Sequence, residues 1–215
     1  MTFYTKNYQE LLKEIKKNKR NVEIIAISKY HPKESIIEAI KHGIKQFGEN
    51  RIQEANEKYR EIKENFPEIR LHFTGNLQSN KIKQAAHFFD AFHTIYKESQ
   101  LTEFAKYQNI VMEKEFFIQV NTGLEASKGG VYPDQVESFL NLSTKTYNIN
   151  IVGLMCIPPI DENPNKHFAL LKELKEKLSL KKLSMGMSND YKEAINCGSD
   201  YIRVGTLLFG ERPWI

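Results

Sequence analysis

The chain has 215 residues, of which 40% are hydrophobic and 27% charged, the composition of a globular protein with a substantial core. This length predicts one domain, residues 1–215. The formal net charge of +4 is small and the basic residues are scattered, which argues against a nucleic-acid partner. No apolar stretch approaches the length of a membrane span and the N-terminus lacks a signal-peptide core, so we expect a cytoplasmic protein without membrane contact.

Metal binding is not expected. The two cysteines, Cys156 and Cys197, lack the short spacing of metal ligands, and free thiols in a reducing compartment are their ordinary state. The six histidines form no HExxH or other tight ligand pattern. We therefore predict neither a structural nor a catalytic metal.

Strand-like and helix-like segments alternate along the chain. An amphipathic helix with Leu11, Leu12 and Ile15 on one face precedes the first strand, which is rich in β-branched residues. A helix follows from Pro32, a favourable residue for a first helical turn. The expected strands cover residues 23–29, 46–48, 71–74, 91–95, 115–121, 149–155, 182–185 and 201–204. The later helices are expected at residues 49–63, from 79, near 98–111, from 133, after 164 and at 191–196.

This alternation predicts an α/β fold, a single (β/α)8 TIM barrel. The chain is near the short end of the size range for such barrels, so its loops must be brief. A doubly wound open sheet is the main competing fold, because alternation alone does not prove that the sheet closes.

Lys29 is the most informative single residue. It closes the first apolar strand, where α/β sheets and barrels place their ligands. Taken alone, it is best interpreted as a solvated residue at a strand exit. A cation there is otherwise costly to bury, and a desolvated, neutral amine can form a Schiff base with a carbonyl ligand.

The seventh and eighth strands are followed by residues suited to an anion. Barrels often bind phosphate with these loops. The Ser188 hydroxyl can donate to an anion, and Gly205 and Thr206 offer backbone amides at a point where glycine permits close approach. Singly, Ser188 is as well explained as a helix cap and Gly205 as a packing glycine. Combined with Lys29, they indicate a phosphorylated aldehyde held at both ends, which describes pyridoxal phosphate.

Several segments resemble the YggS-type pyridoxal phosphate homeostasis proteins. The resemblance extends over nearly the whole chain and keeps the expected order. The matching segments are AISK at 26–29, FGEN at 47–50, HFTGNLQSNK at 72–81, QVN at 119–121, GLM at 153–155, LSMGMS at 183–188, RVGT at 203–206 and FGER at 209–212.

The resemblance implies a barrel of the alanine racemase N-terminal domain type, with pyridoxal 5'-phosphate as an internal aldimine on Lys29. Carried over by position, Arg203 would face the pyridine nitrogen and keep it unprotonated. By the same positional match, Ser188, Gly205 and Thr206 would bind the phosphate, and Asn50 and Met155 would line the ring pocket.

The expected function is that of a carrier in vitamin B6 homeostasis, without catalytic residues or established turnover. Alanine racemases use a β-domain and a partner subunit to supply a second base, and this sequence ends just after its eighth predicted strand. One alternative is a pyridoxal phosphate-dependent racemase or related enzyme, with Lys29 as one base and His72 or Tyr201 as the other. A second is a cofactor-free, aldolase-like barrel that uses Lys29 alone. The expected partners are the cofactor and, transiently, apo-enzymes that use it. No self-complementary apolar helix is evident, so we expect a monomer.

Overall fold

The computed structural model describes residues 3–211, within which eight parallel strands close into a barrel. Each strand pairs with its neighbour in chain order, and β8 pairs with β1 to complete the ring. The strands are β1 Glu23–Ile27, β2 Gln46–Glu49, β3 Arg70–Phe73, β4 Ala91–Ile95, β5 Glu115–Val120, β6 Ile151–Cys156, β7 Lys182–Ser184 and β8 Tyr201–Val204. The predicted (β/α)8 barrel is thus confirmed and the open sheet is excluded. The domain limits at 1 and 215 stay a prediction, and Arg212 of the 209–212 motif lies outside the described residues.

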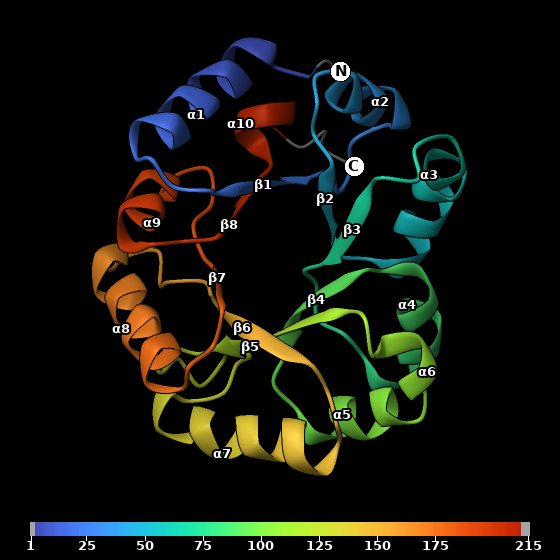
Figure 1. The fold of residues 1–215 in the computed structure, drawn as a ribbon. Helices are drawn as coiled ribbons and strands as arrows, with labels where there is room; N and C mark the ends of the chain where they lie inside the picture. Colours follow the sequence, from blue (N-terminus) through green and yellow to red (C-terminus); the bar gives the residue numbers. More distant parts are fainter. Residues whose placement is uncertain (1–2, 212–215) are drawn as a thin grey trace.

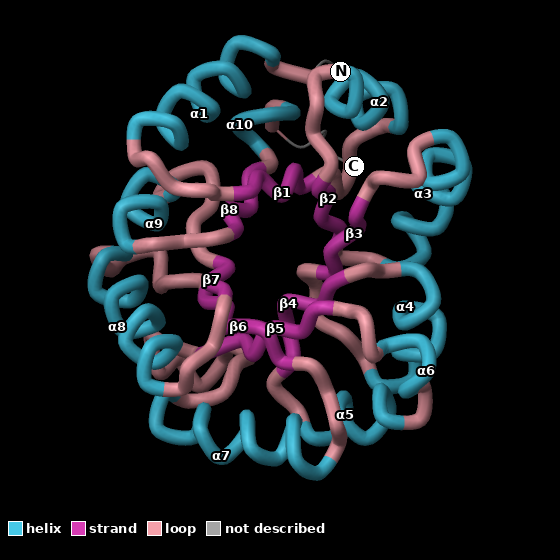
Figure 2. The backbone as a smooth tube through the Cα atoms, in the orientation of Figure 1, coloured by secondary structure: helices cyan, strands magenta, loops and turns pink. Residues whose placement is uncertain are grey.

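The helices form a ring around the strands (Figure 1, Figure 2). They are α1 Thr5–Lys17, α2 Lys33–Lys41, α3 Ile52–Asn65, α4 Ile82–Phe88, α5 Glu98–Ala105, α6 Gln108–Val111, α7 Val136–Asn141, α8 Pro164–Lys177, α9 Tyr191–Cys197 and α10 Thr206–Phe209. Helix α10 directly follows β8 and was not predicted. The helix expected near residues 98–111 is divided into α5 and α6 around Tyr107.

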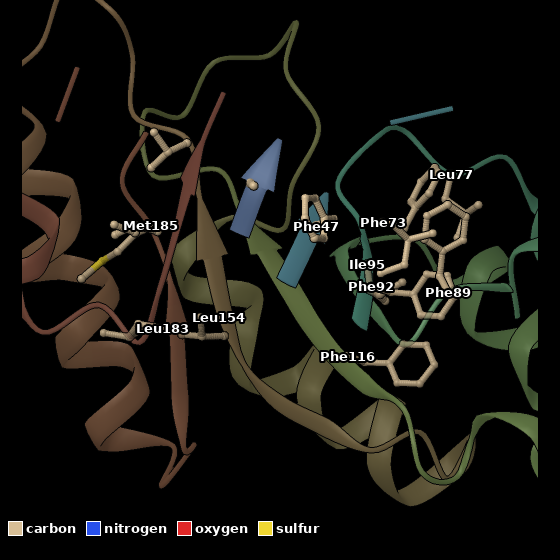
Figure 3. Close-up of a cluster of buried hydrophobic side chains, with 14 of the residues drawn as sticks. Phe47, Phe73, Leu77, Phe89, Phe92, Ile95, Phe116, Leu154, Leu183 and Met185 are labelled. Carbon is tan, nitrogen blue, oxygen red and sulfur yellow. The ribbon is translucent and has the colours of Figure 1, made fainter. Parts of the chain in front are cut away.

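The main core lies between the barrel wall and the helices. On the side of β3, β4 and β5 it is largely aromatic, with Phe92 stacked on Phe116 at a centroid distance of 5.2 Å and edge-on to Phe104 at 4.8 Å. Phe73 meets Phe89 edge-on at 5.1 Å. Figure 3 shows Phe73, Phe89, Phe92 and Phe116 grouped between these strands and the adjacent helix. Offset and edge-to-face contacts of this kind are the favoured arrangements of aromatic rings.

The barrel interior is a separate and more polar layer. A small apolar cluster of Ile25, Phe117, Met155 and Tyr201 lies inside it. Successive strand residues alternate between the two faces of the sheet, so these side chains face the axis while their neighbours face the helices. Buried polar residues, among them His72 and His93, share this interior.

Six of the eight predicted strands differ from the observed ones at one or both ends, and two of them, β1 and β6, differ by two residues at one end. Strand β1 ends at Ile27, because the amide of His31 donates to the carbonyl of Ser28 and Tyr30 adopts a positive φ of 66°. Lys29 therefore occupies a turn beyond the strand. Strand β6 begins at Ile151, since the amide of Ile149 donates to the carbonyl of Ser143 instead of entering the sheet.

The described part of the chain offers neither a membrane span nor a metal cluster. Within residues 3–211, no helix has both the length and the apolar character needed to cross a membrane. In the same part of the chain, no group of three or more His, Cys, Asp or Glu side chains is arranged to hold a metal ion.

Candidate functional site

A cavity of about 860 Å³ opens at the carboxyl ends of the strands. This is the end of the barrel at which (β/α)8 enzymes and binding proteins place their sites. The cavity is within the size range of small-molecule and cofactor pockets. Its walls come from the segments after β1, β3, β6, β7 and β8, including Lys29, His31, Thr74, residues 157–160, residues 187–190, Arg203 and residues 205–207.

Five predicted site residues line this cavity together, namely Lys29, Ser188, Arg203, Gly205 and Thr206. Sheet register explains part of this grouping. Because β1 and β8 are adjacent, with Ile25 opposite Arg203, the turns that carry Lys29 and Gly205 leave neighbouring strands. The closed barrel thus brings residues from the two ends of the sequence to one site.

The other two predicted residues do not line the cavity. Met155 is 1% exposed and packs in the interior apolar cluster. Asn50 follows β2, and its side-chain oxygen is buried without a hydrogen-bond partner among the described residues. Their predicted places beside a cofactor ring therefore stay predictions.

Arg203 is held rigidly at the floor of the cavity. Its side chain is 5% exposed. Nη1 donates to Ser184 Oγ at 2.8 Å and Nη2 donates to the carbonyl of Cys156 at 2.9 Å. Burial lowers the pKa of the guanidinium, which nevertheless stays charged because its ordinary pKa is so high. The cavity therefore contains a cation whose plane is fixed by two neutral acceptors.

The loop after β7 is shaped by Asp190. One carboxylate oxygen of Asp190 accepts the amide of Met187 at 2.6 Å, which closes the turn containing Ser188. Burial raises the pKa of Asp190, and the Met187 hydrogen bond opposes that rise. Ser188 Oγ lies 3.5 Å from the amide of Leu207, a long contact that links this loop to the start of α10. Ser188 and the first amides of α10 thus lie on one wall.

The backbone at Gly205 is closely packed. A Cβ atom there would lie 3.3 Å from both the Cβ and the carbonyl oxygen of Ile27, tighter than most such contacts. Glycine is therefore favoured at this position. The first amides of a helix have no partner within the helix, so those at Thr206 and Leu207 are suited to an anionic oxygen.

Behind Lys29, a buried polar cluster anchors the turn. Ser28 Oγ lies 2.7 Å from Glu49 Oε1 and 2.6 Å from the Tyr59 hydroxyl. Lys58 donates to the carbonyl of Ser28 at 2.8 Å and pairs with Glu49 Oε1 at 2.6 Å. Burial raises the pKa of Glu49, and the nearby Lys58 partly opposes this rise. Burial also raises the pKa of Tyr59 well above its ordinary value. The residue before Lys29 is thus fixed through both its side chain and its carbonyl.

The second bases proposed for an enzyme lie elsewhere. His72 and Tyr201 are buried in the barrel interior and do not line the cavity. The Tyr201 hydroxyl bonds to Lys182 at 2.9 Å and Glu115 at 3.2 Å, the first residues of β7 and β5. That is the amino end of the strands, opposite the cavity. Neither side chain is placed to move a proton on a ligand bound beside Lys29.

Sequence reasoning missed most of the residues that support the site. The alternation of β7 and β4 indicates only that Ser184 and His93 could face inward. Lys58 and Glu54 lie on a charged helix face, where solvent exposure is the ordinary expectation, yet Glu54 accepts the amide of Tyr30 at 2.6 Å. One signal was present: a lysine at 58 lies one helical turn from an acid at 54, a spacing that favours a pair.

A family model described as the N-terminal domain of alanine racemase matches residues 4–213. A pyridoxal phosphate homeostasis protein of Vibrio cholerae is 40% identical over 205 residues, covering 90% of this chain and 87% of the relative.

Two solved structures of PipY from Synechococcus elongatus share the fold. The structure without PLP is 31% identical, with a TM-score of 0.85, and the match covers 95% of this chain and 99% of that chain. The structure with PLP bound is 33% identical, with a TM-score of 0.76, and the match covers 88% and 93% respectively.

Proposed function

The chain belongs to the alanine racemase N-terminal domain family and, within it, to the pyridoxal phosphate homeostasis proteins, and from that premise we propose that it binds pyridoxal 5'-phosphate through Lys29 and acts in intracellular vitamin B6 homeostasis. The observation that carries the proposal is the meeting of Lys29, Arg203 and Ser188 in one cavity. A PLP-bound structure of the relative PipY supports it.

The donor set fits this cofactor. When bound, pyridoxal phosphate supplies an aldehyde that forms an imine with an amine, and a pyridine ring that withdraws electrons. Lys29 offers the amine. The Ser188 hydroxyl and the amides of Gly205 and Thr206 are donors suited to the phosphate. Gly205 has no side chain to cover its amide, and its close packing against Ile27 leaves little space for one.

In this proposal Arg203 serves the ring nitrogen. A guanidinium has only donors, so it satisfies a pyridine nitrogen that stays unprotonated. An unprotonated ring is a weaker electron sink than a protonated one, so it disfavours reactions that pass through a carbanion. Reversible storage of the aldehyde requires no carbanion.

A carrier role agrees with the placement of His72 and Tyr201 away from the cavity. We propose that the protein releases its cofactor to apo-enzymes in transient encounters, and that it is a cytoplasmic monomer. The free thiols of Cys156 and Cys197 are compatible with a reducing compartment.

The test is the visible absorption spectrum of purified protein, before and after borohydride. We expect a yellow band in wild type that Lys29→Ala abolishes, and a borohydride-fixed pyridoxyl adduct on Lys29 in a peptide map. Lys33→Ala, a lysine on the neighbouring helix α2, is the matched control and should keep the band. A wild type that stays colourless after incubation with pyridoxal phosphate would refute the assignment.

A second measurement separates carrier from enzyme. Holo-protein incubated with amino acids in deuterium oxide should show no exchange at the α-carbon over long incubation. It should also restore activity to an added apo-aminotransferase as its own band declines. Exchange at enzymatic rates would instead establish turnover.

A further inference from the structure

A continuous line of hydrogen-bonded side chains crosses the barrel interior beneath the cavity. We call it the interior relay, and it consists of Glu23, Gln46, His72, His93, Ser184 and Arg203. His72 Nδ1 lies 2.8 Å from His93 Nε2, and His72 Nε2 lies 2.7 Å from Gln46 Oε1. His93 Nδ1 lies 2.9 Å from Ser184 Oγ, which in turn accepts from Arg203. At the far end, the Gln46 amide nitrogen contacts a Glu23 carboxylate oxygen.

The middle of the relay is shielded from water. The side chains of His72, His93 and Ser184 are fully buried, and Phe117 stacks on the His93 ring at a centroid distance of 4.4 Å. Buried polar groups that lack a partner are costly, and here each partner is another member of the relay. The arrangement therefore constrains every member.

The cavity end permits one proton order. Arg203 can only donate, so Ser184 Oγ accepts from it, and the Ser184 hydrogen is available for His93 Nδ1. His93 is then the neutral tautomer with hydrogen on Nε2, which donates to His72 Nδ1.

The carboxylate end gives the same order. A carboxylate only accepts, so the nitrogen of the Gln46 amide faces Glu23 and its oxygen faces His72. His72 must then donate from Nε2 and accept at Nδ1. The carboxylate end thus fixes one direction for all donors, from Arg203 to Glu23, and the guanidinium end is compatible with it.

Burial favours neutral histidines in the relay. It lowers the pKa of His72 to about 3 and that of His93 well below its ordinary value. Nearby cations lower both further: Arg70 and Lys182 act on both rings, Lys63 acts on His72 and Arg203 acts on His93. The carboxylates of Glu23 and Glu115 lie at the amino end of the barrel, near Tyr201.

The relay matters for Arg203 because no carboxylate among residues 3–211 lies within ion-pair distance of its guanidinium. Within residues 3–211, none of the ion pairs includes Arg203. Two neutral acceptors, Ser184 Oγ and the Cys156 carbonyl, orient its guanidinium. The cation keeps further donors for a ligand, and the charge of Asp190 acts on it without forming an ion pair.

We propose that Ser184, His93 and His72 are positioning residues that hold Arg203 toward the ring nitrogen of the cofactor, and that they give the cavity its preference for an aromatic ring with a nitrogen acceptor there. This inference rests on the proposed function. It extends that function from the residues lining the cavity to side chains on β3, β4 and β7.

The first test uses the full chain without cofactor. Nitrogen-15 NMR of labelled histidine should show both His72 and His93 as neutral rings with hydrogen on Nε2. Ser184→Ala should alter the His93 signals, because Nδ1 loses its donor. Ser143→Ala, which removes another buried serine hydroxyl far from the site, should alter neither. A charged ring, or hydrogen on Nδ1 of either histidine, would overturn the relay.

The second test compares two ligands, pyridoxal phosphate and its 1-deaza analogue, in which C–H replaces the ring nitrogen. Ser184→Ala should weaken binding of pyridoxal phosphate about tenfold and leave the analogue unchanged, since only the former uses Arg203. Ser184→Thr, which keeps the hydroxyl, should restore the preference. His93→Phe, which removes both ring nitrogens of the relay, should weaken pyridoxal phosphate binding in the same way and provides a second variant if Ser184→Ala does not fold.

The outcomes separate this inference from the proposed function. Equal weakening toward both ligands would overturn the positioning role while leaving cofactor binding intact. A wild type that binds neither ligand would refute both. The NMR result on the cofactor-free protein decides the proton order in either case.

Discussion

The ammonium of Lys58 lies 2.6 Å from Oε1 of Glu49, and the pair is buried directly behind the turn that carries Lys29. Glu49 is fully buried, whereas the Lys58 side chain is 12% exposed. The same ammonium also holds the carbonyl of Ser28. An ion pair in such a place adds little net stability by itself, but removing one partner leaves an uncompensated buried charge.

Replacing Lys58 by methionine should destabilise the protein by about 3 kcal/mol at pH 8. The cause is the Glu49 carboxylate, which loses its cation. Urea denaturation followed by circular dichroism measures the change. Lys172→Met, on the outer face of α8 with a long 3.9 Å pair to Glu176, is the control and should cost under about 0.5 kcal/mol.

The effect of Lys58→Met should shrink as the pH falls. Burial already raises the pKa of Glu49, and losing Lys58 raises it further. A carboxyl whose folded pKa is raised takes up a proton on folding, so its contribution to stability is present at low pH and is lost as the pH rises through the folded pKa. The variant should therefore be closer to wild type at pH 5 than at pH 8. Equal destabilisation at both values would contradict a buried, unpaired carboxylate.

Ser188→Ala tests the proposed phosphate wall. The variant should bind pyridoxal phosphate about tenfold more weakly, because one hydrogen bond to a charged oxygen is lost. Binding of pyridoxal, which has no phosphate, should be unchanged. Spectroscopic titration measures both ligands, and Ser138→Ala, an exposed serine whose hydroxyl donates to the Gln135 carbonyl, is the control. A similar loss for both ligands would place Ser188 elsewhere than at the phosphate.

Much of the cavity could be predicted from the sequence for a physical reason. In a closed parallel barrel all carboxyl ends meet at one rim, so residues just after the strands are neighbours whatever their separation in the chain. Lys29 and Gly205 are an example, because β1 and β8 are paired. Counting strands was enough to place them, and the end of β1 at Ile27 did not alter that placement.

The interior relay could not be predicted in this way. Alternation assigns a side chain to one face of its strand. It does not give the height along the barrel axis at which side chains from non-adjacent strands meet. His93 and Ser184 are 91 positions apart and lie on β4 and β7, which are not neighbours. A register shift between Phe92 and Ile95 also changes the height of His93 along the barrel axis. Only the three-dimensional structure brings these two side chains together.

Phe92→Ala tests the aromatic core between the barrel and its helices. Phe92 is fully buried against Phe104 and Phe116. Its truncation should cost about 3–5 kcal/mol, since the cavity left behind cannot fully collapse among rigid rings. Chemical denaturation measures this loss, and Met112→Ala, at a residue 66% exposed, is the control with little effect. A cost below about 1 kcal/mol would mean that the core repacks freely.

His72→Gln should make the stability of the protein less dependent on pH. Burial lowers the pKa of His72 to about 3 in the folded chain, while the unfolded ring keeps the ordinary value near 6.5. Below that value the unfolded state binds a proton that the folded state does not, so the stability that a neutral His72 provides is complete above about pH 6.5 and falls as the pH drops toward 3. Between pH 7 and pH 5 wild type should lose about 2 kcal/mol more than His72→Gln. Urea denaturation of both proteins across that interval measures the difference. Parallel pH profiles would show that His72 takes up a proton in the folded protein as readily as in the unfolded chain, and the neutral His72 of the interior relay would then be wrong below about pH 6.5.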